Sequence, residues 1–255
     1  MKVALTIGGS DPTSGAGIQM DLKVFHALGV YGTSIITSVT SQSTFEFTSV
    51  YPLPEKIIVS QFETLLKDIK PHGAKTGMLY SKYAVECVAE YIKKYKIKNF
   101  VIDPVITSTI GKKLLLDEAQ QILKTELIPL SRAVTANIPE AEILTEVRIK
   151  NIDDMYEATE KLYRMGTKLA IVKGGHFNEK VPDLLFDGKE FFVVEGEKYS
   201  GEFHGTGCAF SSAFLSFLCK EYKPYEALKA SKNFVSELLR KALKLGKGMK
   251  ILNFT

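Results

Sequence analysis

The stretch HGTGCAFSSAFL (residues 204–215) joins a glycine-rich turn to an apolar helix. Gly205 and Gly207 lack a Cβ, so the turn can adopt unusual backbone angles and lets a ligand approach the backbone closely. The first amide groups of a helix have no partner inside it and form an anion site. The start of a helix also stabilises the thiolate form of a cysteine, so the pattern predicts a lowered pKa for Cys208. The alternative is a plain loop before a core helix, with an inert buried cysteine.

Short apolar segments alternate with longer amphipathic stretches along the rest of the chain. This alternation of expected strands and helices predicts a three-layer α/β fold, with a mainly parallel central sheet and helices on both faces. A small antiparallel hairpin is expected near residues 184–194, where Asp187-Gly188 is a turn signal. Without repeats or linkers, residues 1–255 are expected to form one domain. The expected strands are 3–7, 34–39, 100–102, 133–135 and 169–172, and the expected helices are 18–28, 55–69, 82–95, 115–126, 152–165, 208–220 and 224–243.

Composition favours a soluble cytoplasmic protein with small-molecule partners. Of the 255 residues, 45% are hydrophobic and 24% charged, and the net charge is +4. This mild charge is spread along the chain, which argues against nucleic-acid binding. The three cysteines are widely spaced without a CxxC pair, so neither a zinc site nor a disulfide framework is expected. This cysteine usage favours a reducing compartment. No apolar run approaches the roughly 18 residues of a membrane span, and the N-terminal apolar segment is too short for a signal sequence.

A glycine-rich segment follows the first expected strand. GGSDPTSGAG (residues 8–17) has four glycines in ten residues, a pattern typical of backbone that approaches a small ligand at the end of a strand. Asp21, one turn into the next helix, either reaches the same crevice or faces solvent. The chain has no GxxxxGK[ST] motif and no GxGxxG after the first strand, which excludes a P-loop and a dinucleotide fingerprint.

Charged residues follow three later strands. Asp103 ends one strand and Glu140 follows the next, and two carboxylates at one sheet edge facing a phosphate suit Mg²⁺. Asn137 and Glu140 also suit the start of a helix, as N-cap and first-turn acid. Lys173 ends a further strand, where it either neutralises nucleotide phosphates or meets solvent. His176, three residues on, is more typical of a loop residue that only forms hydrogen bonds.

This ordered set of motifs resembles the ribokinase-like hydroxymethylpyrimidine/phosphomethylpyrimidine kinase family of thiamine biosynthesis. The resemblance implies transfer of the ATP γ-phosphate to a pyrimidine hydroxymethyl group and then to the resulting phosphate. It also implies Mg²⁺ as cofactor, a cytoplasmic location and a homodimer. The segments that carry it are GGSDPTSGAGIQMDLKVF (8–25), TSQST (40–44), KTGML (75–79), VIDPV (101–105), TANIPEAEIL (135–144), VKGGH (172–176), DLLFDG (183–188) and HGTGCAFSSA (204–213).

The resemblance further implies a role for each matching site residue. Cys208 would accept the proton of the substrate hydroxyl, beside an anion hole formed by Gly205, Thr206 and Gly207. The metal and phosphates would be served by Asp103 and Glu140. ATP would be bound by Lys173, Asn137 and Thr206. The pyrimidine would be bound by Gly9, Ala16, Asp21, Gln42, Met78 and Val105.

The chain departs from the family pattern in places, and three alternatives stay open. The segment ITSTIG (106–111) differs from the usual family sequence, which leaves the shape of the loop over the phosphates undecided. Ala136 stands where the family commonly has proline, and Ala209 where it commonly has threonine. Pyridoxal kinases of the same fold are the nearest alternative, although those specialised for pyridoxal usually carry aspartate where Cys208 stands. A cysteine hydrolase would need a histidine base. A silent pyrimidine or nucleotide binder would be expected to lack one of the charged residues.

Overall fold

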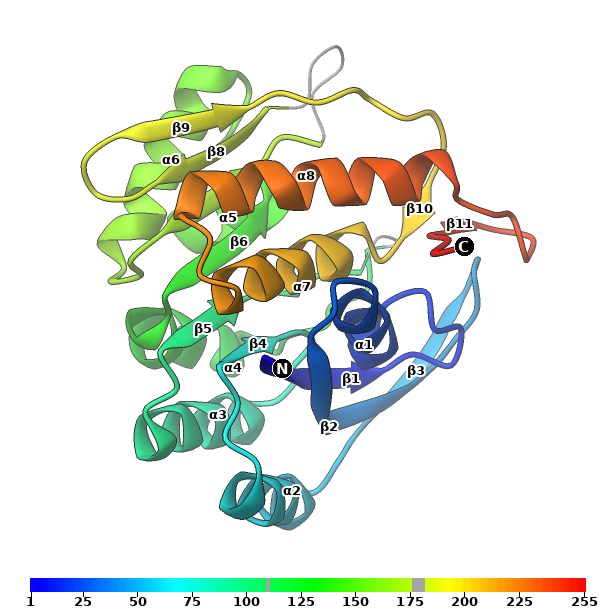
Figure 1. The fold of residues 1–255 in the computed structure, drawn as a ribbon, viewed down its shortest axis with the longest axis vertical. Coiled ribbons are helices and arrows are strands. Elements are labelled where there is room, and N and C mark those ends of the chain that lie inside the picture. Colours follow the sequence, from blue (N-terminus) through cyan, green and yellow to red (C-terminus); the bar gives the residue numbers. More distant parts are fainter. Residues whose placement is uncertain (109–110, 176–181) are drawn as a thin grey trace.

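A nine-stranded, mainly parallel sheet lies between two layers of helices in the computed structural model, which describes residues 1–108, 111–175 and 182–255 (Figure 1). The strand order is β3-β2-β1-β4-β5-β6-β7-β8-β9. The pairs β2–β3, β7–β8 and β8–β9 are antiparallel, and the other neighbours are parallel. A separate short pairing joins β10 to β11. The strands are β1 (Val3–Ser10), β2 (Tyr31–Gln42), β3 (Phe47–Pro52), β4 (Gly73–Thr76), β5 (Asn99–Ile102), β6 (Ala133–Asn137), β7 (Ala170–Lys173), β8 (Asp183–Phe186), β9 (Phe191–Val194), β10 (Phe203–His204) and β11 (Lys250–Ile251).

Helices α1, α7 and α8 cover one face of the sheet, and α2 to α6 cover the other (Figure 1). Helix α6 begins at a capping box that was not expected from the sequence. Asn151 opens α6, where its side chain accepts a hydrogen bond from the amide of Asp154 at 3.0 Å and the Asp154 carboxylate accepts one from the Asn151 amide. The helices are α1 (Gly17–Ala27), α2 (Glu55–Asp68), α3 (Lys82–Tyr95), α4 (Asp117–Ile122, continued by a π-helical turn Leu123–Leu127 and a 3₁₀ turn Ile128–Leu130), α5 (Ile138–Thr145), α6 (Ile152–Arg164), α7 (Thr206–Cys219) and α8 (Pro224–Arg240).

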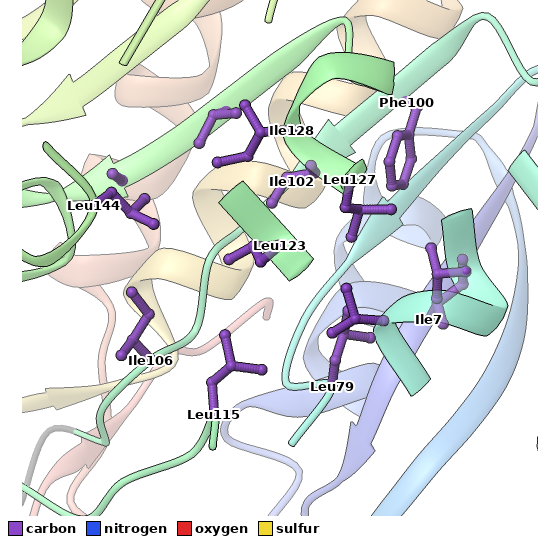
Figure 2. Close-up of a cluster of buried hydrophobic side chains, with 14 of the residues drawn as sticks. Ile7, Leu79, Phe100, Ile102, Ile106, Leu115, Leu123, Leu127, Ile128 and Leu144 are labelled. Atoms are coloured by element: carbon purple, nitrogen blue, oxygen red, sulfur yellow. The ribbon is translucent and has the colours of Figure 1, made fainter. Parts of the chain in front are cut away.

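The central strands are buried on both faces, which explains their nearly continuous apolar sequences. In β5, Phe100 and Ile102 face the layer of α2 to α6, while Val101 faces the layer of α1, α7 and α8. Figure 2 shows Phe100 and Ile102 in the larger of the two cores, together with Leu123 and Leu127 from the turn that follows α4. The sheet therefore separates two apolar cores and holds its strand ends in fixed positions.

The expected fold class is confirmed, including the antiparallel hairpin, which is formed by β8 and β9. The helix expected over 115–126 begins at Asp117 and ends in π and 3₁₀ turns. Four strands were not expected from the sequence: β3, β4, β10 and β11. Within the described ranges, no helix is both long and apolar enough to cross a bilayer.

Candidate active site

The glycine-rich turn leads into α7 as the sequence predicts. Gly205 is the N-cap with φ 79°, and no side chain caps the helix, so its first amide groups stay open to a ligand. A Cβ on Gly205 would overlap the carbonyl oxygen of Gly15. A Cβ on Gly207 would lie 3.5 Å from the Lys173 amine and 3.9 Å from the Asp103 carboxylate. Only glycine fits at position 205, whereas a Cβ at position 207 would make ordinary contacts with one cation and one anion that bound the space beside it.

Asp11 ties the loop after β1 to this turn. Its carboxylate accepts hydrogen bonds from the amides of Thr13 and Ala16, both at 2.8 Å, and pairs with His204 Nε2 at 2.8 Å. Burial acts to raise the pKa of Asp11, but hydrogen bonds from His204 and Thr13 outweigh it and hold the pKa below its usual value. Loop 11–17 is thereby fixed against the start of α7.

Two adjoining cavities open at the carboxyl ends of the parallel strands. The first, of about 180 Å³, is lined by five of the six residues expected to bind the pyrimidine; these are Gly9, Ala16, Gln42, Met78 and Val105. The second, of about 510 Å³, extends toward Tyr199 and the side chains of α8. Asn137, Glu140, Lys173, Thr206 and Gly207 line both cavities. A ligand in each cavity would meet its neighbour at the start of α7.

Three charged groups surround this junction. Lys173 Nζ lies 3.6 Å from Asp103 Oδ1 and 5.6 Å from the centre of the Phe210 ring. The other oxygen of Asp103, Oδ2, accepts a hydrogen bond from Ser211 Oγ at 3.0 Å. Burial raises the pKa of Glu140 to about 8; Lys173 opposes this rise and Asp103 adds to it. The two carboxylates therefore interact across the same space.

This donor set suits a hard divalent cation that keeps much of its water. Mg²⁺ is usually held by one or two carboxylates together with phosphate oxygens and water, and the junction offers Asp103 and Glu140 beside open space at Gly207. In the described part of the chain, no cluster of three or more His, Cys, Asp or Glu side chains is poised to hold a metal. A cation here would take its remaining ligands from nucleotide phosphate and water.

Asn137 and Glu140 also form the expected helix cap. The Asn137 side chain accepts a hydrogen bond from the Glu140 amide, and the Glu140 carboxylate accepts one from the Asn137 amide, both at 2.9 Å. This capping box starts α5 and fixes both side chains at the cavity edge. The structural and the binding interpretation of these residues are therefore compatible.

Asp21 lies elsewhere than predicted. It lines neither cavity and does not face solvent, because its carboxylate is buried and accepts hydrogen bonds from Lys75, Thr6 and Ser212. The prediction that Asp21 contacts the pyrimidine is not supported, because from α1 the side chain reaches Thr6 on β1 and Lys75 on β4 instead of a cavity wall.

The predicted pKa of Cys208 also needs correction. Burial raises the pKa of this thiol to about 12, and the opposing effects of Lys75 and of the Gly17 amide do not offset it. A helix N-terminus lowers a thiol pKa most where water freely reaches the sulfur, and Cys208 is only partly exposed, at the wall of the first cavity. Cys208 lines the first cavity as a protonated thiol.

Sequence reasoning missed three residues that organise the site. Lys75, Asp11 and His204 are all buried, and each carries a charge or a hydrogen-bonding ring. Their signal in the sequence is a polar side chain inside or beside a strand where an apolar one is expected. His176 and residues 109–110 of the loop 106–111 lie outside the described residues, whereas Thr107 and Ser108 of that loop line both cavities.

Comparison with known proteins identifies the architecture. The family model for phosphomethylpyrimidine kinase matches residues 11–253. The chain belongs to this kinase family. A Bacillus subtilis hydroxymethylpyrimidine/phosphomethylpyrimidine kinase is 41% identical over 248 residues, which cover 96% of this chain and 92% of that protein.

Solved structures of the same family and fold agree with this assignment. The crystal structure of a Clostridium difficile phosphomethylpyrimidine kinase is 40% identical, with a TM-score of 0.83, covering 93% of this chain and 99% of that one. The Staphylococcus aureus pyridoxal kinase in complex with AMP-PCP and pyridoxal is 30% identical, with a TM-score of 0.92, covering 100% of this chain and 93% of that one. A kinase with the ribokinase-like fold is thus established, and a cysteine hydrolase is excluded.

Proposed function

We propose that this kinase uses Mg-ATP to phosphorylate 4-amino-5-hydroxymethyl-2-methylpyrimidine and then its monophosphate, as a cytoplasmic enzyme of thiamine biosynthesis. The observation that carries the proposal is the meeting of two cavities at the start of α7, with Gln42 in one and Lys173 at their junction. The relatives named as kinases of both pyrimidine compounds support this substrate. The three free thiols support a reducing compartment.

In this proposal the chain acts mainly by positioning and by charge stabilisation. The oxygen–phosphorus bond to the substrate hydroxyl forms as the bond from the γ-phosphorus to the β,γ-bridging oxygen breaks, in line across the cavity junction. The amides of Thr206, Gly207 and Cys208 together with the Lys173 amine stabilise the charge on the transferred group. The small thiolate fraction of Cys208 receives the hydroxyl proton. Bound Mg²⁺, held by Asp103 and Glu140, would neutralise further phosphate charge.

Pyridoxal is the second candidate substrate. The solved Staphylococcus aureus relative is named as a pyridoxal kinase complex, so the same fold accommodates a six-membered ring with a hydroxymethyl group. The higher sequence identity to pyrimidine kinases favours the pyrimidine, whereas the TM-score is higher for the pyridoxal kinase. We expect ADP release with the pyrimidine to exceed that with pyridoxal by at least about tenfold in kcat/KM, a difference that one good polar contact supplies. Turnover of pyridoxal with none of the pyrimidine would reverse the assignment.

Gln42 is proposed to recognise the ring of the substrate by hydrogen bonding. It lies at the end of β2 on the wall of the first cavity, where its side-chain amide donates to Thr40 Oγ1 at 3.0 Å and keeps a carbonyl acceptor. Gln42→Ala should lower kcat/KM for the pyrimidine about 10- to 100-fold, because a polar group of the bound ring loses its partner. ADP affinity should stay the same.

Steady-state kinetics and calorimetric ADP titration separate these two effects. Gln120→Ala is the matched control, since Gln120 bonds the carbonyl of Leu115 and lines neither cavity. It should leave both quantities unchanged. Equal kcat/KM values for Gln42→Ala and the unsubstituted protein would remove Gln42 from the binding site.

A further inference from the structure

A fully buried lysine lies beneath the proposed active site. Lys75, on β4, has an exposed fraction of 0%, and its amine lies 2.8 Å from Asp21 Oδ1 and 4.0 Å from Asp103 Oδ2. Burial acts to lower the pKa of Lys75, but Asp21, followed by Cys208 and Asp103, outweighs it and raises the pKa above its usual value. The side chain is therefore a cation shared between two carboxylates.

The same two carboxylates are anchored to α7 by consecutive serines. Ser212 donates to Asp21 at 2.7 Å, and Ser211 donates to Asp103 at 3.0 Å. These serines lie one turn beyond the anion turn at the start of α7. Lys75 thus connects β4, α1 and the end of β5 to the helix that would bind the transferred phosphate.

The two oxygens of Asp103 face different cations. Oδ2 accepts a hydrogen bond from Ser211 and lies 4.0 Å from Lys75 Nζ, while Oδ1 lies 3.6 Å from Lys173 Nζ; both oxygens also border the space beside Gly207. A cation on the inner side draws part of the negative charge of Asp103 inward. The less charge Asp103 shows to the cavity, the less it holds Lys173 and the less it attracts Mg²⁺.

We propose that Lys75 is a positioning residue that divides its charge between Asp21 and Asp103 and thereby sets how strongly Asp103 holds Lys173 and Mg²⁺. The inference rests on the proposed roles of Asp103 and Lys173 in the kinase reaction. Lys75 itself touches no substrate, because it is buried below both cavities. Its effect passes through the carboxylate of Asp103, whose two oxygens contact Lys75 and Lys173.

Two variants should change Mg²⁺ dependence in opposite directions. Asp21→Asn leaves the whole charge of Lys75 to Asp103, so the Mg²⁺ concentration needed for half-maximal enhancement of ADP binding should rise about 3- to 10-fold. Lys75→Met combined with Asp21→Asn removes both buried charges and exposes the full charge of Asp103. That concentration should then fall, and ADP affinity in EDTA should drop about tenfold because Asp103 draws Lys173 away from phosphate.

Calorimetric ADP titrations in EDTA and at a series of Mg²⁺ concentrations test this without substrate turnover. Leu162→Ala, in the opposite core on α6, is the control for lost stability. It should lower Tm and leave both ADP measurements unchanged. If Lys75 only fills space, both network variants should resemble this control, and that result would overturn the proposal.

The sign of the shift keeps the proposal testable if the double variant does not fold. Asp21→Asn adds no unpaired buried anion and keeps Lys75 beside Asp103, so an unchanged or reduced Mg²⁺ requirement in this variant alone contradicts the inference. ADP binding requires no pyrimidine. An unsubstituted protein that binds Mg-ADP but does not phosphorylate the pyrimidine would therefore overturn the proposed substrate and leave the role of Lys75 intact.

Discussion

Replacing Gly205 with alanine is expected to lower kcat/KM by about 10³-fold or more. The left-handed backbone of Gly205, with φ 79°, would cost an alanine about 1–2 kcal/mol. The larger effect is steric, because the new Cβ would overlap the carbonyl oxygen of Gly15 and lie 3.1 Å from Ala16 Cα. Either the anion turn or the loop before α1 must move, and each misplaced donor to a developing charge costs about 10²–10³-fold in kcat. Steady-state ADP release measures the loss.

Gly29 offers a control that separates the cost of a left-handed backbone from the steric overlap of the new Cβ with neighbouring atoms. Gly29 also has a positive φ of 65°, but the nearest atom to an added Cβ is the flexible amine of Lys220 at 4.0 Å. Gly29→Ala should lower the free energy of unfolding by about 1 kcal/mol in urea and leave kinetics normal. Turnover of Gly205→Ala within tenfold of the unsubstituted protein would mean that the anion turn does not carry the reaction.

Much of the site could be predicted because parallel strands end at one edge of the sheet. Asp103 follows β5, Asn137 ends β6 and Lys173 ends β7, and these strands are neighbours in the sheet. Order along the sequence therefore predicts proximity in space. The structure brings Lys173 within 3.6 Å of Asp103, although these residues are far apart in the chain.

The buried part of the site could not be predicted in this way. β4 reads Gly73-Ala74-Lys75-Thr76, too short and too polar for periodicity to indicate a strand. A lysine can be buried only where other elements provide its partners, and the nearest partner of Lys75 is Asp21, 54 residues earlier. Asp21 was open to two interpretations in the sequence, crevice or solvent, and neither included a buried partner.

The error on the Cys208 pKa has a related cause. A local motif places the thiol at a helix N-terminus, which favours the thiolate. The dominant effect is burial, which raises the pKa of this thiol to about 12, and the nearby carboxylates of Asp21 and Asp103 add to the rise. Burial depends on tertiary packing, so a five-residue motif predicts the position of this thiol but not its protonation state.

The raised pKa gives Cys208 a test that a packing residue would not pass. Cys208→Ala should lower kcat by about 10²–10⁴-fold, the range of general-base catalysis, while ADP still binds. In the unsubstituted protein kcat should rise steadily above neutral pH, because the thiolate fraction grows about tenfold for each pH unit below the pKa. In Cys208→Ala this thiolate is absent, so kcat should not rise tenfold for each pH unit and its pH profile should be much flatter.

Cys219 is the matched control, since it lies on the same helix and its thiol pKa is also raised to about 12, yet it lines neither cavity. Cys219→Ala should keep both kcat and the steadily rising pH profile. Comparing the two variants separates the effect of losing a thiol from α7 from the effect of losing the proton acceptor. If Cys208→Ala retains kcat within threefold and its profile keeps rising, the proton leaves by another route. Lys173 and the amides of the anion turn would then carry the catalysis.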